Sequence, residues 1–155
     1  MKLEFGCLWI VKNLLGGLRG YCVRQNIFNI FGENMESLIV MSLVLAILQI
    51  WIIPMVLNMK NMNWLLSNRE DSDEPSEMLA RARRASTNLQ ESLPAFLALA
   101  LLSMIVSVDV TSAACWWLIF RVAHGATYIL GITYVRTLAW FGSIGSLIAM
   151  ACALV

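Results

Sequence analysis

Long uncharged stretches alternate with short polar segments along most of this chain. Residues 37–59, 92–108 and 137–155 carry no charged side chain, and residues 110–135 carry Arg121 and His124 alone. Each stretch approaches the roughly 20 apolar residues that a helix needs to cross a bilayer core of about 30 Å. The runs are continuous and do not alternate, which argues against membrane strands. The pattern predicts an all-α integral membrane protein.

We expect four transmembrane helices that pack as one bundle, over about residues 36–59, 76–108, 113–134 and 135–155. Ser76 and Glu77 resemble a helix start, because serine caps free N–H groups and an early acid suits the helix dipole. A tight turn over 109–112 and a short connection after the third helix make the last three helices antiparallel neighbours. Pro54 is expected to kink the first helix. Small residues allow the fourth helix to approach a neighbour closely: Gly142, Ser143, Gly145 and Ser146.

Residues 1–34 differ from the rest of the chain. Basic residues interrupt their short apolar patches: Lys2, Lys12, Arg19 and Arg24. We predict that translation starts at Met35, so that residues 1–34 are an extension separate from a four-helix transmembrane domain over 35–155. The alternative is an amphipathic helix that lies on the membrane surface.

Basic residues between the first two helices predict the orientation in the membrane. They are Lys60, Arg69, Arg81, Arg83 and Arg84. The positive-inside rule places this first loop in the cytoplasm, together with Arg136 at the corner between the third and fourth helices. The basic extension would then lie on the opposite side, which is a second reason to separate it. A bacterial inner membrane or an endomembrane fits this topology.

Composition excludes several other classes of protein. The chain is 59% hydrophobic and 14% charged with a net charge of +1, and it has no basic patch of the nucleic-acid-binding type. Its four cysteines are scattered and it has one histidine, so neither a metal site nor a redox pair is predicted. The sequence also lacks a GxSxG elbow, a P-loop and a glycine-rich dinucleotide turn.

Two helices carry polar faces that could form a functional site. Helical spacing places one set of side chains on a shared face of the second helix: Arg81, Arg84, Asn88 and Glu91. The third helix carries a similar face: Arg121, His124 and Tyr128. A charged residue in mid-membrane costs about 2.5–3.5 kcal/mol on insertion scales, so Arg121 should face protein or water. Both faces then point into the bundle, which suggests a site for a small zwitterion. The plainer alternative is a structural ion pair of Arg121 with Glu91 and a satisfied core histidine.

These motifs resemble a known family. The second-helix motif reads Arg81-x-x-Arg84-Ala85-x-x-Asn88-x-x-Glu91-x-x-Pro94. It is similar to the signature of the MAPEG superfamily, the membrane-associated proteins in eicosanoid and glutathione metabolism. Arg121-Val122-Ala123-His124 followed by Tyr128 resembles the third helix of its microsomal prostaglandin E synthase branch. The resemblance covers residues 35–155, and a four-helix bundle with a long first loop is also the family architecture.

The resemblance implies a homotrimer that binds glutathione at its subunit interfaces. By position, Arg84 would pair with a glutathione carboxylate, Asn88 would hydrogen-bond its backbone and Glu91 would take its ammonium group. His124 and Tyr128 would line the pocket. Arg136 would be the catalytic residue, nearest the sulfur, with a hydroxyl hydrogen bond from Thr137.

Two positions depart from the family pattern. Lys60 stands where many members have an arginine near the cytoplasmic end of the first helix, and Thr87 replaces an arginine of the prostaglandin branch. These departures argue against a specific eicosanoid synthase. The sequence therefore predicts a glutathione transferase or peroxidase, with glutathione as co-substrate, that acts on lipophilic electrophiles. The alternatives are a non-catalytic structural or binding protein of the membrane and a small four-helix exporter. The exporter would need a carboxylate within the first span, where residues 37–59 have none.

Overall fold

A computed structural model describes residues 34–59 and 76–155. Residues 1–33 of the predicted extension lie outside these ranges, as do Lys60 and Arg69 of the first loop. The described part is all-α, as the sequence predicts. Its helices are α3 (Met35–Ile47), the π-helical turn η1 (Leu48–Ile52), α4 (Ile53–Leu57), α6 (Glu77–Val106), α7 (Thr111–Leu130) and α8 (Thr133–Leu154). The segments α3, η1 and α4 follow one another without a break.

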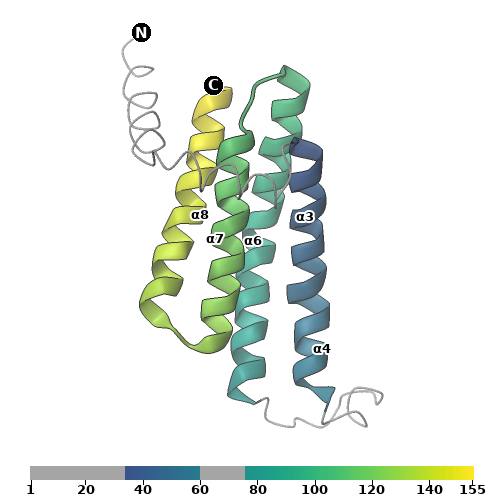
Figure 1. Cartoon of the computed structure of the whole chain (residues 1–155), viewed down its shortest axis with the longest axis vertical. Helices are drawn as coiled ribbons and strands as arrows, with labels where there is room; N and C mark the ends of the chain where they lie inside the picture. The colour runs from purple at the N-terminus through teal and green to yellow at the C-terminus, as the bar shows by residue number, and fades with distance from the viewer. Residues whose placement is uncertain (1–33, 60–75) are drawn as a thin grey trace, which may run out of the picture.

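The helices lie side by side in one bundle (Figure 1). The helix α7 packs against α3, α6 and α8, so it has neighbours on three sides. Three helices are long and apolar enough to cross a membrane: Met35–Leu57, Glu77–Val106 and Thr133–Leu154. With 20 residues, α7 is outside that set, because Arg121 and His124 lower its mean hydropathy. Three of the four predicted spans therefore meet the requirement of length and composition.

Capping groups decide where α6 begins and ends. The Ser76 hydroxyl accepts a hydrogen bond from the Leu79 N–H at 3.3 Å, which confirms the predicted start. At the other end Ser107 adopts a left-handed φ of 56°, and the chain turns at residues 107–110. The predicted turn at 109–112 was therefore two residues late. The Asp109 carboxylate accepts the Thr111 N–H at 3.0 Å, and this bond lowers the pKa of Asp109 below its ordinary value.

The corner between α7 and α8 also differs from the prediction. The helix α7 ends at Leu130 and not at Tyr134, because Gly131 takes a left-handed φ of 79°. The Ile132 N–H donates to the Thr127 carbonyl at 2.9 Å and the Gly131 N–H to the Tyr128 carbonyl at 3.2 Å. This pair of bonds is a Schellman motif, which stops a helix and favours glycine at the left-handed position.

Aromatic packing forms the centre of the core. The rings of Phe96 on α6 and Trp117 on α7 are both fully buried, and they stack with centroids 3.9 Å apart at 7°. Gly142 of α8 lies against the Phe120 ring, whereas Gly145 faces open space within the described chain. Of the two glycines that were predicted to allow close helix packing, Gly142 alone does so among the described residues.

Candidate functional site

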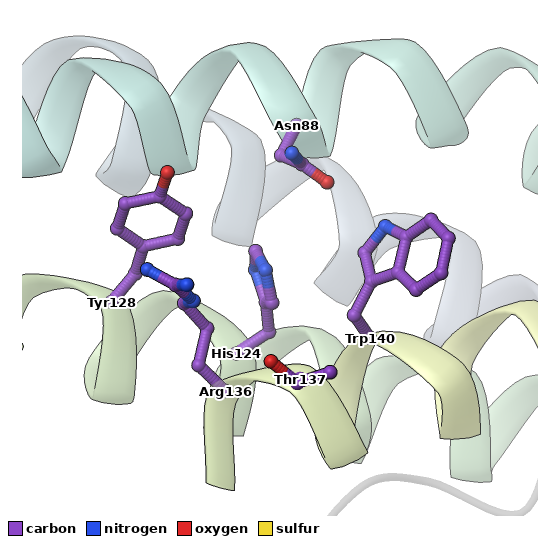
Figure 2. A pocket seen from close by; sticks show the side chains of 6 residues that line it. All are labelled: Asn88, His124, Tyr128, Arg136, Thr137 and Trp140. Carbon is purple, nitrogen blue, oxygen red and sulfur yellow. The ribbon is translucent and has the colours of Figure 1, made fainter. Parts of the chain in front are cut away.

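A pocket of about 290 Å³ opens between the first half of α6, the second half of α7 and the first half of α8. The residues that line it are Asn88, His124, Tyr128, Arg136, Thr137 and Trp140 (Figure 2). Its volume is just below the range of roughly 300–1,000 Å³ that small-molecule sites occupy. Asn88 comes from α6, the histidine and tyrosine from α7, and the remaining three from α8. The structure thus brings four of the six predicted site residues together in one pocket.

Arg136 supplies the positive charge of this pocket. Its guanidinium carbon lies 4.6 Å from the centroid of the Tyr128 ring, which is a cation–π contact. The His124 ring meets the same tyrosine edge-on, with centroids 5.5 Å apart at 72°. Figure 2 shows the Arg136 side chain reaching toward Tyr128 from the α8 side. No carboxylate is among the lining residues, so the pocket favours an anionic ligand group.

Local helix geometry presents these groups. His124 and Tyr128 are four residues apart on α7, so both side chains project from the same face. On α8, Arg136 and Trp140 have the same spacing. Because α8 begins directly after the Gly131 corner, its first turns lie beside the last turns of α7. The early stop of α7 therefore places Arg136 opposite Tyr128.

Arg81 lies at this corner and does not line the pocket. A Cβ on Gly131 would be 2.7 Å from Arg81 Nη1, so the guanidinium covers the glycine at the α7 terminus. Glu77 holds the other side of Arg81 in an ion pair at 3.0 Å. A cation at a helix C-terminus is stabilised by the helix dipole. Arg81 thus joins the start of α6 to the α7–α8 corner.

Arg84 and Glu91 are the two predicted site residues that the pocket of the single chain does not contain. Both are exposed, and neither lines the pocket. They flank Asn88 on α6, four residues before it and three residues after it. The half-buried Asn88 is thus the member of the predicted α6 face that meets the other site residues.

Arg121 is buried, with 2% of its surface exposed. Its guanidinium carbon lies 5.9 Å from the centroid of the Trp117 ring. In the described part of the chain, its Nε and Nη1 atoms have no hydrogen-bond partner and no ion pair joins it to Glu91. The expectation that Arg121 avoids lipid is confirmed, because protein surrounds it. The structural ion pair that was the plainer alternative does not form within the described residues.

The sequence did not indicate two further residues near the site. Trp140 lines the pocket, and its position four residues after Arg136 was a usable signal. Gln49 is buried at 5% exposure in the first helix, and its side chain lies against Gly125 of α7, the residue after His124. A glutamine in an otherwise uncharged run was the available signal. Thr137 does line the pocket, but its hydroxyl donates to the Thr133 carbonyl at 3.0 Å.

The described side chains give no support to a metal centre. Across residues 34–59 and 76–155, no group of three or more histidine, cysteine, aspartate or glutamate side chains is placed to hold an ion. The chemistry of the pocket is that of an arginine, a tyrosine, a histidine and an amide.

Comparison with known proteins places the chain in a family. The model of the MAPEG family matches residues 38–155, which is most of the chain and includes every pocket residue. No curated protein and no solved structure gives a significant match. The family, together with three helices apolar enough to span a bilayer, indicates a membrane protein. The chain belongs to the MAPEG family.

Proposed function

We propose that this protein is a glutathione-dependent membrane enzyme, a transferase or peroxidase that acts on lipophilic electrophiles. Membership of the MAPEG family, which includes glutathione transferases and related proteins, supports this class. The observation that carries the proposal is Arg136, a cation held over the Tyr128 ring in a pocket without a carboxylate. Glutathione is the co-substrate, and its sulfur binds beside Arg136.

The chemistry follows from the preference of a guanidinium for anions. A free thiol titrates near pH 8.5, and a positive charge within about 4–6 Å favours the thiolate, which is the nucleophile. Arginine suits this role because it remains charged in a partly dry site. The thiol proton leaves to solvent, the sulfur forms a bond to the electrophilic carbon, and the leaving group departs with its electron pair. The Thr137 hydroxyl can donate to sulfur if it gives up its bond to the Thr133 carbonyl.

The remaining predicted contacts belong to a trimer. We place glutathione at an interface between subunits, where Arg84 pairs with its carboxylate and Glu91 with its ammonium group. Two observations support an interface: both side chains are exposed in the single chain, and both flank Asn88, which lines the pocket. His124 and Tyr128 form the inner wall of the site.

We also propose that α7 is the fourth transmembrane helix. A helix of 20 residues is about 30 Å long, which matches the bilayer core. Its polar residues Arg121 and His124 are buried among the other helices and so do not meet lipid. Arg81 lies against the α7–α8 corner, so the start of α6 and Arg136 are at one end of the bundle. We assign that end to the cytoplasm.

Calorimetry on the purified full-length protein in detergent tests the proposal. Glutathione should bind, and its disulfide-linked dimer, which has no thiol to ionise at Arg136, should bind more weakly. Absorbance of the thiolate should appear when glutathione is added at neutral pH. Absence of both binding and the thiolate signal would overturn the proposal. Binding without a thiolate signal would favour a non-catalytic binding protein of the membrane.

A further inference from the structure

One residue of the first helix contacts both helices that carry the α6 and α7 walls of the pocket. The Gln49 carbonyl accepts a hydrogen bond from the Ser86 hydroxyl on α6, two residues before Asn88. The Gln49 side chain lies against Gly125 on α7, next to His124. Gln49 itself does not line the pocket. This double contact is not explained by lipid exposure, because Gln49 is 5% exposed.

The π-helical turn explains why this carbonyl is free to bind α6. In a regular helix the Gln49 carbonyl would accept the N–H of Ile53. Here the Ile53 N–H donates to Leu48, five residues back. The next possible donor for Gln49 is residue 54, which is a proline and has no N–H. A buried carbonyl without a partner is costly. The Ser86 hydroxyl donates to it at 2.5 Å and also lies 2.9 Å from the Ala82 carbonyl of its own helix.

The side chain of Gln49 uses a gap that only glycine leaves. A Cβ on Gly125 would lie 1.7 Å from Gln49 Nε2 and 2.8 Å from its Cδ, so an alanine at this position would force the end of the Gln49 side chain to move. Gly125 is buried. The carboxamide therefore approaches the α7 backbone beside His124. This contact limits how far α7 can rotate about its own axis relative to the first helix.

We propose that Gln49 is a positioning residue for the pocket. The π turn and Pro54 direct its carbonyl to Ser86 and its carboxamide to Gly125. These two contacts fix how α7 presents His124 and Tyr128 to Asn88. Among the described residues, Gln49 makes no hydrogen bond to Arg136 or to any other residue that lines the pocket. The inference rests on the proposed function for the identity of the ligand, but its geometric part is testable without a ligand.

The single histidine of the chain provides that ligand-free measurement. Its imidazole resonance in the full-length protein in detergent reports the ring geometry at Tyr128, because aromatic rings shift nearby nuclei. Gln49→Ala and Ser86→Ala should both move this resonance. Ser103→Ala is the matched control, since both serines are buried on α6 and bond within their own helix, but Ser86 alone of the two also bonds another helix among the described residues. An unmoved resonance in Gln49→Ala, or an equal movement in Ser103→Ala, would overturn the proposal.

A steric rescue separates positioning from general damage. Gly125→Ala should weaken glutathione binding about tenfold, because the new methyl group displaces the Gln49 side chain from its contact with α7. Adding Gln49→Ala to the same chain removes the clashing atoms, so Gly125→Ala should have little further effect, and the double variant should bind about as well as Gln49→Ala alone. Gly145→Ala is the control, because nothing lies within 4 Å of a Cβ there in the described chain. A double variant that binds about tenfold more weakly than Gln49→Ala alone would contradict the proposal.

The two tests also separate this inference from the proposed function. If the parent protein binds no glutathione, the proposed function fails, and the histidine resonance still decides whether Gln49 positions the pocket. If glutathione binds but the resonance does not respond to Gln49→Ala, the positioning role fails and the proposed function stands.

Discussion

The two halves of α6 contribute different contacts to the bundle. In residues 77–91 Leu79 and Leu89 are buried together with the small residues Ala82, Ala85 and Ser86, and the Ser86 hydroxyl binds the Gln49 carbonyl of the first helix. In residues 92–106 the stacked pair of Phe96 and Trp117 fills the space. The first half also supplies Asn88 to the pocket, whereas the second half supplies the Phe96 ring to the aromatic centre of the core. One half of α6 therefore carries the site, and the other carries the largest buried ring of this helix.

Trp117→Ala should produce the largest change, and it tests the packing half of the comparison. Removal of a fully buried tryptophan that stacks on Phe96 typically costs about 3–5 kcal/mol in free energy of unfolding. Denaturant unfolding in detergent measures this loss. Trp51→Ala is the control, because Trp51 is 71% exposed and should change stability little. A loss equal to that of the control would show that the core does not depend on the aromatic pair.

Arg136→Ala tests the site half of the comparison. We expect turnover with a chloronitroarene electrophile to fall about 10²–10³-fold, as for the loss of one group that stabilises developing charge. Glutathione affinity should change much less, since the interaction is made mainly with the thiolate and the transition state. Arg136→Lys should restore part of the rate, because it keeps the charge and loses the planar contact with Tyr128. Full activity in Arg136→Ala would move the role to Arg121 or Tyr128.

Glu91→Gln tests whether the site extends along α6 beyond Asn88. Loss of one charge-assisted hydrogen bond costs about 1.5–3 kcal/mol, so glutathione should bind roughly ten- to a hundredfold more weakly. Arg83→Gln is the matched control, because Arg83 is also exposed on α6 but lies off the face of Asn88. Calorimetry compares the two variants. Equal affinities would show that the α6 face is not part of the site.

Asp109→Asn should give the smallest effect, at the end of the bundle away from the pocket. The Thr111 N–H lowers the pKa of the Asp109 carboxylate, so the charged form stabilises the folded state. This contribution is present at neutral pH and is lost as the pH falls through the lowered pKa. Thermal melts from neutral to acidic pH should show a slightly shallower decline in the variant. An identical pH dependence in both proteins would mean that this bond adds nothing.

Some features of the fold could be predicted because they depend on nearby residues alone. Uncharged runs predicted the helices, and Ser76 predicted where α6 begins. The end of α7 was also set by nearby residues, and Gly131 was the signal that was overlooked, because a glycine in the left-handed conformation ends a helix in a Schellman motif. Gln49 was missed for a different reason. Its role depends on a π turn, on Pro54 and on a glycine that is distant in sequence.

Four of the six predicted site residues lie together in the structure, and their roles stay predictions. Helical spacing and the family resemblance identified Asn88, His124, Tyr128 and Arg136, and these four line one pocket. Spacing alone could not separate Arg84 and Glu91 from Asn88, although the single chain leaves those two exposed outside the pocket. A shared helix face fixes direction within about a third of a turn, but it does not fix which neighbour covers each position. Their contribution stays a prediction that depends on a second subunit.

The ionisation of bound glutathione tests the central claim most directly. Thiolate absorbance, followed against pH with glutathione bound to the full-length protein, gives the apparent pKa of the thiol. We predict a value below the roughly 8.5 of a free thiol in the parent protein, and a return toward that value in Arg136→Ala. An apparent pKa that is the same in both proteins, or the absence of any thiolate signal in the parent, would contradict the account of Arg136 as the group that activates the thiol.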